Sequence, residues 1–333
     1  MESLPPVSIL ISTKGRRKLA ERLLKSIKGL DYPEDKLEIV VVEETAEPKP
    51  IEGVKYITIP PENRGFAYSR NVALRNASHP LVAFTDDDCL VHPQWLRELV
   101  SAFKPGVFGV AGAVLLTEPS LIGYCESILG FPGGGIKYLV NSDGKLKPTK
   151  YLSTCNCAYL KEKIEEVGGF KDQLPTRGTD YLLAKDVSKQ YTCLYNPRAI
   201  VYHQPRGSFR EIFRWFIRRG RGELTSLGLI EDKKGEIIHC FSSSLTLKIL
   251  LLILLLSILP VSFLPALIAV MVVYYSLILY RYYFGYRYYK SLGAWLLVPL
   301  VKLVMDLGTD FGRLSFLWKR PGKKESIPSK KVL

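Results

Sequence analysis

Two apolar runs near the C-terminal end constrain the fold of this 333-residue chain most strongly. Residues 245–260 are nearly all Leu and Ile, with Lys248 among them, and residues 263–281 are apolar again up to Arg281. Each run approaches the roughly 17–25 residues that a helix needs to cross a bilayer. We therefore expect two transmembrane helices, at about 245–260 and 263–281, which form a hairpin in a multi-pass protein of the cell membrane.

The distribution of charge sets the expected topology. Residues 1–225 mix charged and apolar residues, which predicts a soluble domain followed by a linker over 226–244. The first six residues lack the basic start of a secretion signal, so this domain is expected in the cytoplasm. Basic residues in 281–290 and in the tail 319–333 favour the cytoplasmic side for both segments. The net charge of +14 then indicates an anionic membrane surface, rather than nucleic acid, as a partner.

Residues 291–318 have a mixed character. They are largely apolar, but Lys302, Asp306, Asp310 and Arg313 form a polar stripe at helical spacing. We expect a helix that lies in the membrane interface or re-enters the membrane. A third crossing, with the stripe packed inside a helix bundle, is the alternative.

The N-terminal part alternates between strand and helix patterns. Short apolar runs predict strands, and leucines at helical spacing predict helices between them. The predicted strands are 7–12, 37–42, 56–59 and 81–84, and the predicted helices are 17–28 and 67–77. This order predicts an α/β fold with a Rossmann-like, mainly parallel sheet flanked by helices. No GxGxxG follows the first strand, which disfavours a dinucleotide site.

Three consecutive acids, Asp86, Asp87 and Asp88, follow the strand 81–84. The carboxyl edge of such a sheet is where ligands bind. Adjacent carboxylates repel one another, and oxygen ligands of this kind suit Mg²⁺ or Mn²⁺. The pattern therefore predicts a divalent metal with open positions for substrate phosphates, and a solvated acidic turn is the alternative.

Polar residues gather at the same edge after the other strands. An edge that carries acids, an amide and basic groups together fits a nucleoside diphosphate. The residues are Thr13, Lys14, Arg16, Glu43, Asn63 and Arg70. Each of them taken alone is compatible with an ordinary surface position.

These motifs resemble those of family 2 glycosyltransferases with the GT-A fold, over about residues 6–222. The similar segments are Ser12 to Arg16, Glu43, Asn63-x-Gly65 with Arg70-Asn71, Asp86 to Asp88, Asn156, Val167 to Phe170, and Gly178 to Asp180. Two positions depart from the family pattern, because Glu44 stands where an Asp is usual and Thr179 where a Glu is usual.

The resemblance implies roles for these residues. It implies a nucleotide-sugar site formed by Ser12, Thr13, Lys14, Arg16, Glu43, Asn63, Gly65, Arg70, Asp86 and Asp87. The H-x-x-R-x-S pattern at His203 is similar to one whose histidine ligates the metal, which implies the set Asp86, Asp88 and His203 for Mn²⁺ or Mg²⁺. Asp180 is the implied catalytic base, which takes a proton from a hydroxyl acceptor. Its alternative role is a helix N-cap.

Residues 208–223 predict an amphipathic helix that lies at the membrane interface. Arg210, Arg214 and Arg218 fall at i, i+4 and i+8, and aromatic and aliphatic residues cover the other faces. Such a stripe contacts lipid headgroups or the diphosphate of a polyprenyl carrier. A buried helix with a solvated arginine face is the alternative.

The combined pattern predicts an inverting, metal-dependent glycosyltransferase, that is, a hexosyltransferase. The expected donor is a UDP- or GDP-sugar, and the expected acceptor is a polyprenyl (dolichyl) phosphate or a lipid-linked glycan. We also expect contact with membrane lipids, no nucleic acid, and a homo-oligomer through the membrane helices. The alternatives are a processive polysaccharide synthase and a non-catalytic membrane scaffold. Phe213-Arg214-Trp215 offers part of the synthase motif Q-x-x-R-W, but position 211 is Glu.

Overall fold

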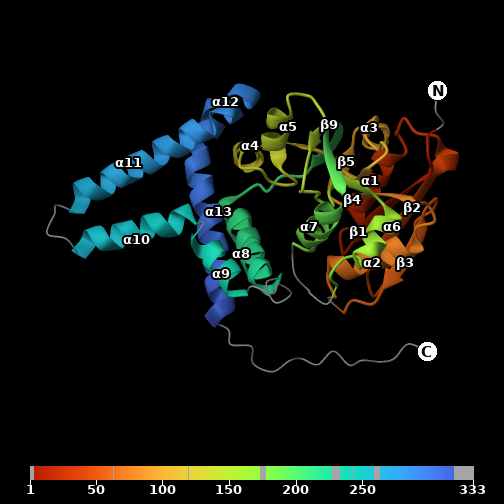
Figure 1. Ribbon diagram of the computed structural model, residues 1–333, viewed down its shortest axis with the longest axis horizontal. Coiled ribbons are helices and arrows are strands. Elements are labelled where there is room, and N and C mark those ends of the chain that lie inside the picture. The colour runs from red at the N-terminus through yellow and green to blue at the C-terminus, as the bar shows by residue number, and fades with distance from the viewer. Residues whose placement is uncertain are drawn as a thin grey trace.

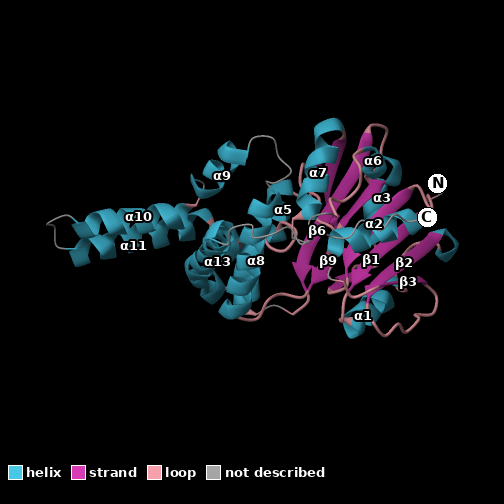
Figure 2. Cartoon of the chain, turned by 90° about the horizontal axis from the view of Figure 1, so that it is seen from below, coloured by secondary structure: helices cyan, strands magenta, loops and turns pink. Residues whose placement is uncertain are grey.

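The computed structural model describes residues 4–62, 64–118, 120–172, 178–226, 233–242, 244–258 and 263–318. A nine-stranded mixed sheet forms the centre of the N-terminal part, with helices on both faces (Figures 1 and 2). The strand order is β3-β2-β1-β4-β8-β6-β9-β5, and β7 pairs with β9. The predicted α/β fold is therefore confirmed. Asn63 and the tail 319–333 lie outside the described residues.

The N-terminal half of the sheet contains the four predicted strands, all parallel to one another. They are β1 (Val7–Thr13), β2 (Leu37–Glu44), β3 (Lys55–Ile59) and β4 (Leu81–Asp86). The helices between them are α1 (Arg17–Ile27), a 3₁₀ turn (Glu34–Lys36) and α2 (Phe66–Asn76). Every residue of β1 is buried, as expected of a central parallel strand that is covered on both faces.

The second half of the sheet is mixed. Its strands are β5 (Cys89–Val91), β6 (Val107–Leu116), β7 (Lys147–Pro148), β8 (Cys157–Leu160) and β9 (Thr192–His203). Its helices are α3 (Trp95–Ser101), α4 (Leu121–Ile128), α5 (Gly135–Ser142), α6 (Lys161–Glu166) and α7 (Thr179–Gln190). Strand β8 runs antiparallel between β4 and β6, whereas β6 and β9 are parallel.

A short antiparallel pairing brings the end of β9 to the acidic segment. In this pairing Cys89 of β5 lies opposite His203, the last residue of β9. The short strand β5 begins directly after Asp88. The sheet therefore places His203 beside the acids, although more than a hundred residues of sequence separate them.

The C-terminal part consists of helices. They are α8 (Phe209–Ser226), α9 (Lys233–Ser242), α10 (Leu245–Ile258), α11 (Phe263–Arg281), α12 (Tyr283–Tyr289) and α13 (Leu292–Trp318). Figures 1 and 2 both show α10 and α11 side by side, extending away from the sheet, while α13 runs across their base. Among the described residues, α11 and α13 are long and apolar enough to cross a membrane, and the apolar part of α10 is shorter.

Helices α8 and α13 pack closely against each other through glycines. A Cβ added at Gly220 of α8 would lie 2.1 Å from the carbonyl oxygen of Thr309. A Cβ added at Gly312 of α13 would lie 2.2 Å from the carbonyl oxygen of Ile217. The predicted amphipathic helix at 208–223 is thus largely α8, and one of its faces is covered by α13.

The polar stripe of α13 faces neighbouring helices. Arg313 donates to Glu223 of α8 at 2.8 Å, and Asp310 accepts from Ser244 at 2.5 Å. Asp306 accepts from Thr246 of α10 at 2.9 Å. These contacts satisfy the charged groups of the stripe within the protein.

Candidate functional site

A cleft of about 1300 Å³ opens where β4 and β9 end, between helices α7 and α8. Asp86 and Asp88 line it from the end of β4, and His203 lines it from the end of β9. Asp180 lines it from the first turn of α7. The structure thus brings the predicted metal ligands and the predicted base into one cleft.

Two arginines hold the acidic segment. Arg16 donates to Asp88 at 2.7 Å and also forms an ion pair with Asp87. Arg70 of α2 donates to Asp86 at 3.0 Å. Since three adjacent carboxylates repel one another, these cations stabilise the acids in their present positions.

Asp87 differs from its neighbours because it is fully buried beneath the cleft. It accepts a hydrogen bond from Thr13 at 2.7 Å and one from Arg16 at 3.0 Å. Burial raises the pKa of Asp87 to about 6, although Arg16 and Thr13 act in the opposite direction. The side chain thus connects β1 to the acidic segment.

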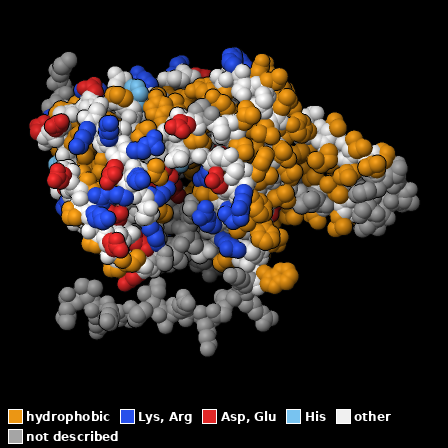
Figure 3. Space-filling model, turned by 180° about the vertical axis from the view of Figure 1, so that it is seen from behind, with side chains coloured by type: hydrophobic (Ala, Val, Ile, Leu, Met, Phe, Trp, Pro, Cys, Tyr) orange, Lys and Arg blue, Asp and Glu red, His pale blue; other side chains and the backbone are white. Residues whose placement is uncertain are grey.

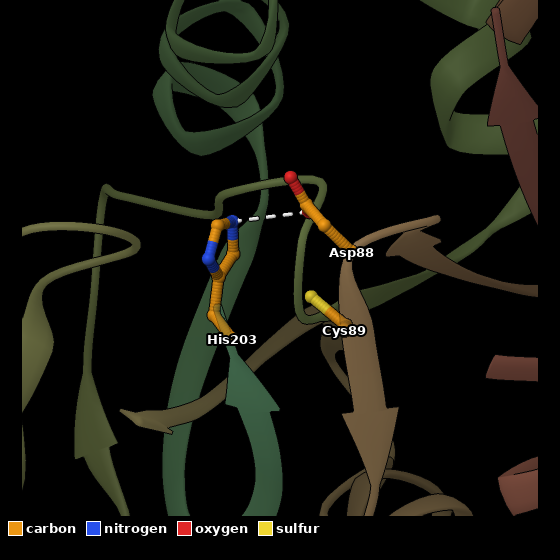
Figure 4. A group of neighbouring side chains, drawn as sticks. All are labelled: Asp88, Cys89 and His203. Carbon is orange, nitrogen blue, oxygen red and sulfur yellow. Dashed lines mark ion pairs between the residues drawn. The ribbon is translucent and has the colours of Figure 1, made fainter. Parts of the chain in front are cut away.

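The pair formed by Asp88 and His203 has the geometry of a cation site (Figure 4). The Nδ1 atom of His203 lies 2.7 Å from the carbonyl oxygen of Gln204, which can only accept a hydrogen bond. Nδ1 therefore carries a proton, and Nε2 is the ring nitrogen that faces Asp88 Oδ1, at 3.2 Å. That oxygen has no hydrogen-bond partner among the described residues. In a protonated ring this contact is an ion pair, and in a neutral ring Nε2 and Oδ1 can both ligate a cation, while Nδ1 is bonded to a carbonyl as is common in metal-ligating histidines.

A third donor lies near this pair. The Sγ atom of Cys89 and the ligand atoms of Asp88 and His203 all lie within 4.8 Å of one another. Burial raises the pKa of the Cys89 thiol well above its ordinary value, which keeps the sulfur protonated in the absence of a cation. Asp86 lies outside this group of three donors but lines the same cleft.

Asp180 lies beside polar groups on the opposite wall. Its carboxylate is 3.4 Å from the Ser153 hydroxyl and accepts the backbone N–H of Tyr181 at 2.9 Å. The N-cap of α7 is Gly178, and Asp180 lies in the first turn, where its carboxylate satisfies the N–H of Tyr181. The carboxylate lines the cleft, where it is accessible to a substrate.

The other predicted donor-binding residues lie beside the cleft and do not line it. Glu43 is buried and accepts from Tyr56 at 2.6 Å and from Arg17 at 3.1 Å. Lys14 forms an ion pair with Glu44 at 2.6 Å. Ser12, Thr13, Gly65 and Asp87 are likewise absent from the described lining of the cleft. Their contact with a donor stays a prediction.

Two asparagines in the segments that resemble family 2 glycosyltransferases make hydrogen bonds within the fold. The Asn156 amide donates to the carbonyl oxygens of Ala113 and Ala199, both at 2.8 Å, and accepts from Trp95. Asn71 exchanges two hydrogen bonds with the backbone of Phe170. These residues join strands and helices behind the cleft.

The cleft wall also contains a buried ion pair that the sequence did not predict. Glu126 of α4 is fully buried, and its carboxylate pairs with Arg206, whose guanidinium lies 4.2 Å from the ring of Trp215. Arg206 and Trp215 both line the cleft. A lone acid within the apolar segment 121–129 was the signal that could have identified this pair.

Comparison with known proteins agrees with the fold. A family model described as glycosyl transferase family 2 matches residues 8–168. The glycosyltransferase AglE of Haloferax volcanii is 25% identical over 236 residues, which cover 67% of this chain and 74% of that protein. The mannosyltransferase PcManGT from Pyrobaculum calidifontis, solved in complex with GDP-Man and Mn²⁺, matches with a TM-score of 0.55 at 19% identity. That match covers 95% of this chain and 88% of the other, and it shows a shared GT-A fold.

Proposed function

We propose that this chain, a glycosyltransferase whose residues 8–168 match glycosyl transferase family 2, transfers a sugar from a nucleotide-diphosphate sugar to a lipid-linked acceptor at a membrane. The observation that carries the proposal is the Asp88–His203 pair, whose Oδ1 and Nε2 atoms lie 3.2 Å apart in a large cleft at the carboxyl edge of the sheet. The similarity in fold to a mannosyltransferase that binds GDP-Man and Mn²⁺ supports a metal-assisted nucleotide-sugar site.

The metal site would be formed by Asp88 and His203, with Asp86 contributing directly or through water. A divalent cation bound there would neutralise the charge of the leaving diphosphate. Arg16 and Arg70 line the cleft next to these acids and can pair with further anionic oxygens of the donor. Both Mn²⁺ and Mg²⁺ suit the carboxylates, and the imidazole favours Mn²⁺.

Asp180 is the residue proposed to act on the acceptor. It lines the cleft, and its carboxylate can take a proton from an acceptor hydroxyl that attacks the anomeric carbon. One displacement from the face opposite the leaving group inverts the anomeric centre. An acceptor that attacks through a phosphate is already anionic and needs no proton removed.

Membrane attachment is supported by the exposed apolar side chains of α10 and α11. Leu255, Leu264, Val272 and Leu277 are each more than half exposed. Figure 3 shows that apolar side chains cover the arm formed by these helices and continue onto the adjoining part of the molecule. We propose that the α10–α11 hairpin inserts into the bilayer and holds the cleft near its cytoplasmic surface.

The test is a screen of donor hydrolysis and transfer across UDP- and GDP-sugars, with polyprenyl phosphate in neutral detergent as acceptor. Turnover of one donor, abolished by EDTA and restored by Mn²⁺ or Mg²⁺, is the expected result. His203→Ala should raise the metal concentration required for half-maximal turnover, whereas His79→Ala, a matched change outside the cleft lining, should not. Turnover that is insensitive to EDTA would contradict the metal assignment.

A further inference from the structure

The cleft is larger than a nucleotide sugar requires. Its volume of about 1300 Å³ exceeds the roughly 300–1,000 Å³ of typical small-molecule sites. From the acids the lining continues past Asp180 to α8 and reaches Cys240 of α9 and Arg313 of α13. The part of the cleft beyond Asp180, toward α8 and α9, is therefore available to a second ligand.

Three basic side chains line this part of the cleft without a carboxylate partner among the described residues. They are Lys185 of α7 and Arg214 and Arg218 of α8. Arg214 and Arg218 are exposed and stand one helical turn apart, so their guanidinium groups can converge on one ligand. An anion is the ligand that such a group of cations would attract.

The other arginines of this wall are already neutralised. Arg206 is paired with Glu126, Arg219 with Glu223, and Arg313 with both Glu223 and Asp310. The charge left for a ligand is therefore concentrated on Lys185, Arg214 and Arg218, which we call the cationic triad.

The surroundings of the cationic triad suit a lipid. Trp215 and Ile217 line the cleft next to the two arginines. The opposite side of α8 packs on α13, whose outward side chains Phe311, Leu314 and Leu317 are at least half exposed. A ligand with an anionic head beside the cationic triad would thus have the apolar side chains of Trp215 and Ile217 next to it for the start of a hydrocarbon chain.

We propose that the cationic triad binds the phosphate group of the lipid-linked acceptor and so holds the acceptor in the cleft beside the donor site. This inference rests on the proposed function and adds to it the subsite that recognises the acceptor. Charge-assisted hydrogen bonds from arginine to phosphate are short and directional, which suits a positioning role. Headgroups of bulk anionic lipids share this chemistry, and the experiment separates the two sources.

The test measures the binding of polyprenyl phosphate to the purified full-length protein in neutral detergent micelles. The variants are Arg214→Gln, Arg218→Gln, the double variant and Lys185→Gln. The control is Arg210→Gln, because Arg210 is exposed one turn earlier on α8 and does not line the cleft. We expect the dissociation constant to rise at least about tenfold for each arginine removed, and to stay at the wild-type value in the control. Equal affinities of the variants and the control would overturn the inference.

A second arm addresses bulk lipid. Binding of the same proteins is compared on neutral phosphatidylcholine vesicles and on vesicles that also contain phosphatidylglycerol. If the triad variants lose only the preference for phosphatidylglycerol and keep full affinity for polyprenyl phosphate, the triad serves bulk headgroups and the inference is wrong.

The binding readout also separates this inference from the proposed function. Failure of the inference would leave wild-type donor turnover intact. Failure of the proposed function would appear as no turnover of any donor, even where polyprenyl phosphate binding still depends on the triad.

Discussion

Asp88 is the side chain on which the metal assignment depends most. One of its oxygens accepts a hydrogen bond from Arg16, and the other faces the Nε2 atom of His203. These two contacts explain why the carboxylate is held in one orientation without a donor for its second oxygen.

Asp88→Asn should therefore lower sugar transfer by at least about a hundredfold, since a catalytic metal stabilises the transition state by several kcal/mol. The amide keeps the shape of the carboxylate and loses its charge. Titration of turnover with Mn²⁺ measures the effect. Asp31→Asn, which alters an exposed acid paired with Arg97, is the control and should behave as wild type. An unchanged Mn²⁺ titration in the Asp88 variant would remove this ligand from the site.

Asp180→Asn should leave donor affinity unchanged and lower the rate of transfer to a hydroxyl acceptor by about 10²–10⁴-fold. The reason is that the amide cannot take a proton. Transfer to a phosphate acceptor should fall much less, because that acceptor is already ionised. Single-turnover rates with both acceptor types provide the measurement, and a wild-type rate with the hydroxyl acceptor would exclude Asp180 as the base.

Glu126 shows how a buried charge supports the cleft wall. Glu126→Ala leaves Arg206 without its partner, and breaking a buried pair in this way costs about 3–5 kcal/mol. The melting temperature in detergent should fall by several degrees. Glu21→Ala removes an exposed i,i+4 partner of Arg17 and should cost less than about 0.5 kcal/mol. Equal melting temperatures for the two variants would contradict a stabilising role for the Glu126 pair.

Among the helices, the contact of α8 with α13 links the cleft to the apolar part of the chain. One side of α8 carries the arginines that line the cleft, and the other side meets the glycines of α13. The position of α8, and with it the width of the cleft, therefore depends on how closely the two helices approach.

Gly312→Ala should separate these helices, because the added Cβ would lie 2.2 Å from the backbone oxygen of Ile217. Overpacking of this kind costs about 1–3 kcal/mol. Gly293→Ala on the same helix meets only a side-chain atom of Leu121 at 3.6 Å, so it should be neutral or stabilising. Thermal unfolding of both variants measures the difference in their stability. A Gly312 variant as stable as the Gly293 variant would show that the two helices can move apart without cost.

Across the full chain, the arrangement of the helices bears on topology. The α10–α11 hairpin points away from the sheet, and α13 runs across its base (Figure 1). Along its length α13 packs on α4 and α8, where Cys125 donates to the Ala294 carbonyl and Gly312 meets Ile217. We therefore propose that α13 lies in the membrane interface and does not form a third crossing.

Labelling of single cysteines in intact cells with an impermeant reagent tests this topology. A cysteine introduced at Val261, between α10 and α11, should be labelled from outside. A cysteine introduced at Ser329 in the tail should be labelled only after lysis, since two crossings return the chain to the cytoplasm. Outside labelling at Ser329 would establish a third crossing by α13.

Local patterns in the sequence determined the elements and the chemistry of the acidic segment. The apolar run that ends in Asp86 to Asp88, the helical spacing in 208–223 and the runs in 245–281 appear as β4, α8 and the α10–α11 hairpin. Period and composition act over a few residues, so they specify such elements wherever the chain later places them. The metal set was inferred from a resemblance, and the sheet then brought Asp88 and His203 together.

Only the tertiary structure decided which side chains meet. The insertion of β8 between β4 and β6, the pairing of Glu126 with Arg206 across 80 residues, and the burial of Asp87 follow from sheet order and packing. The same is true of the cationic triad, which α7 and α8 contribute from separate parts of the chain. Contacts of this kind depend on the free energy of burying many residues at once, and no short stretch of sequence encodes that sum.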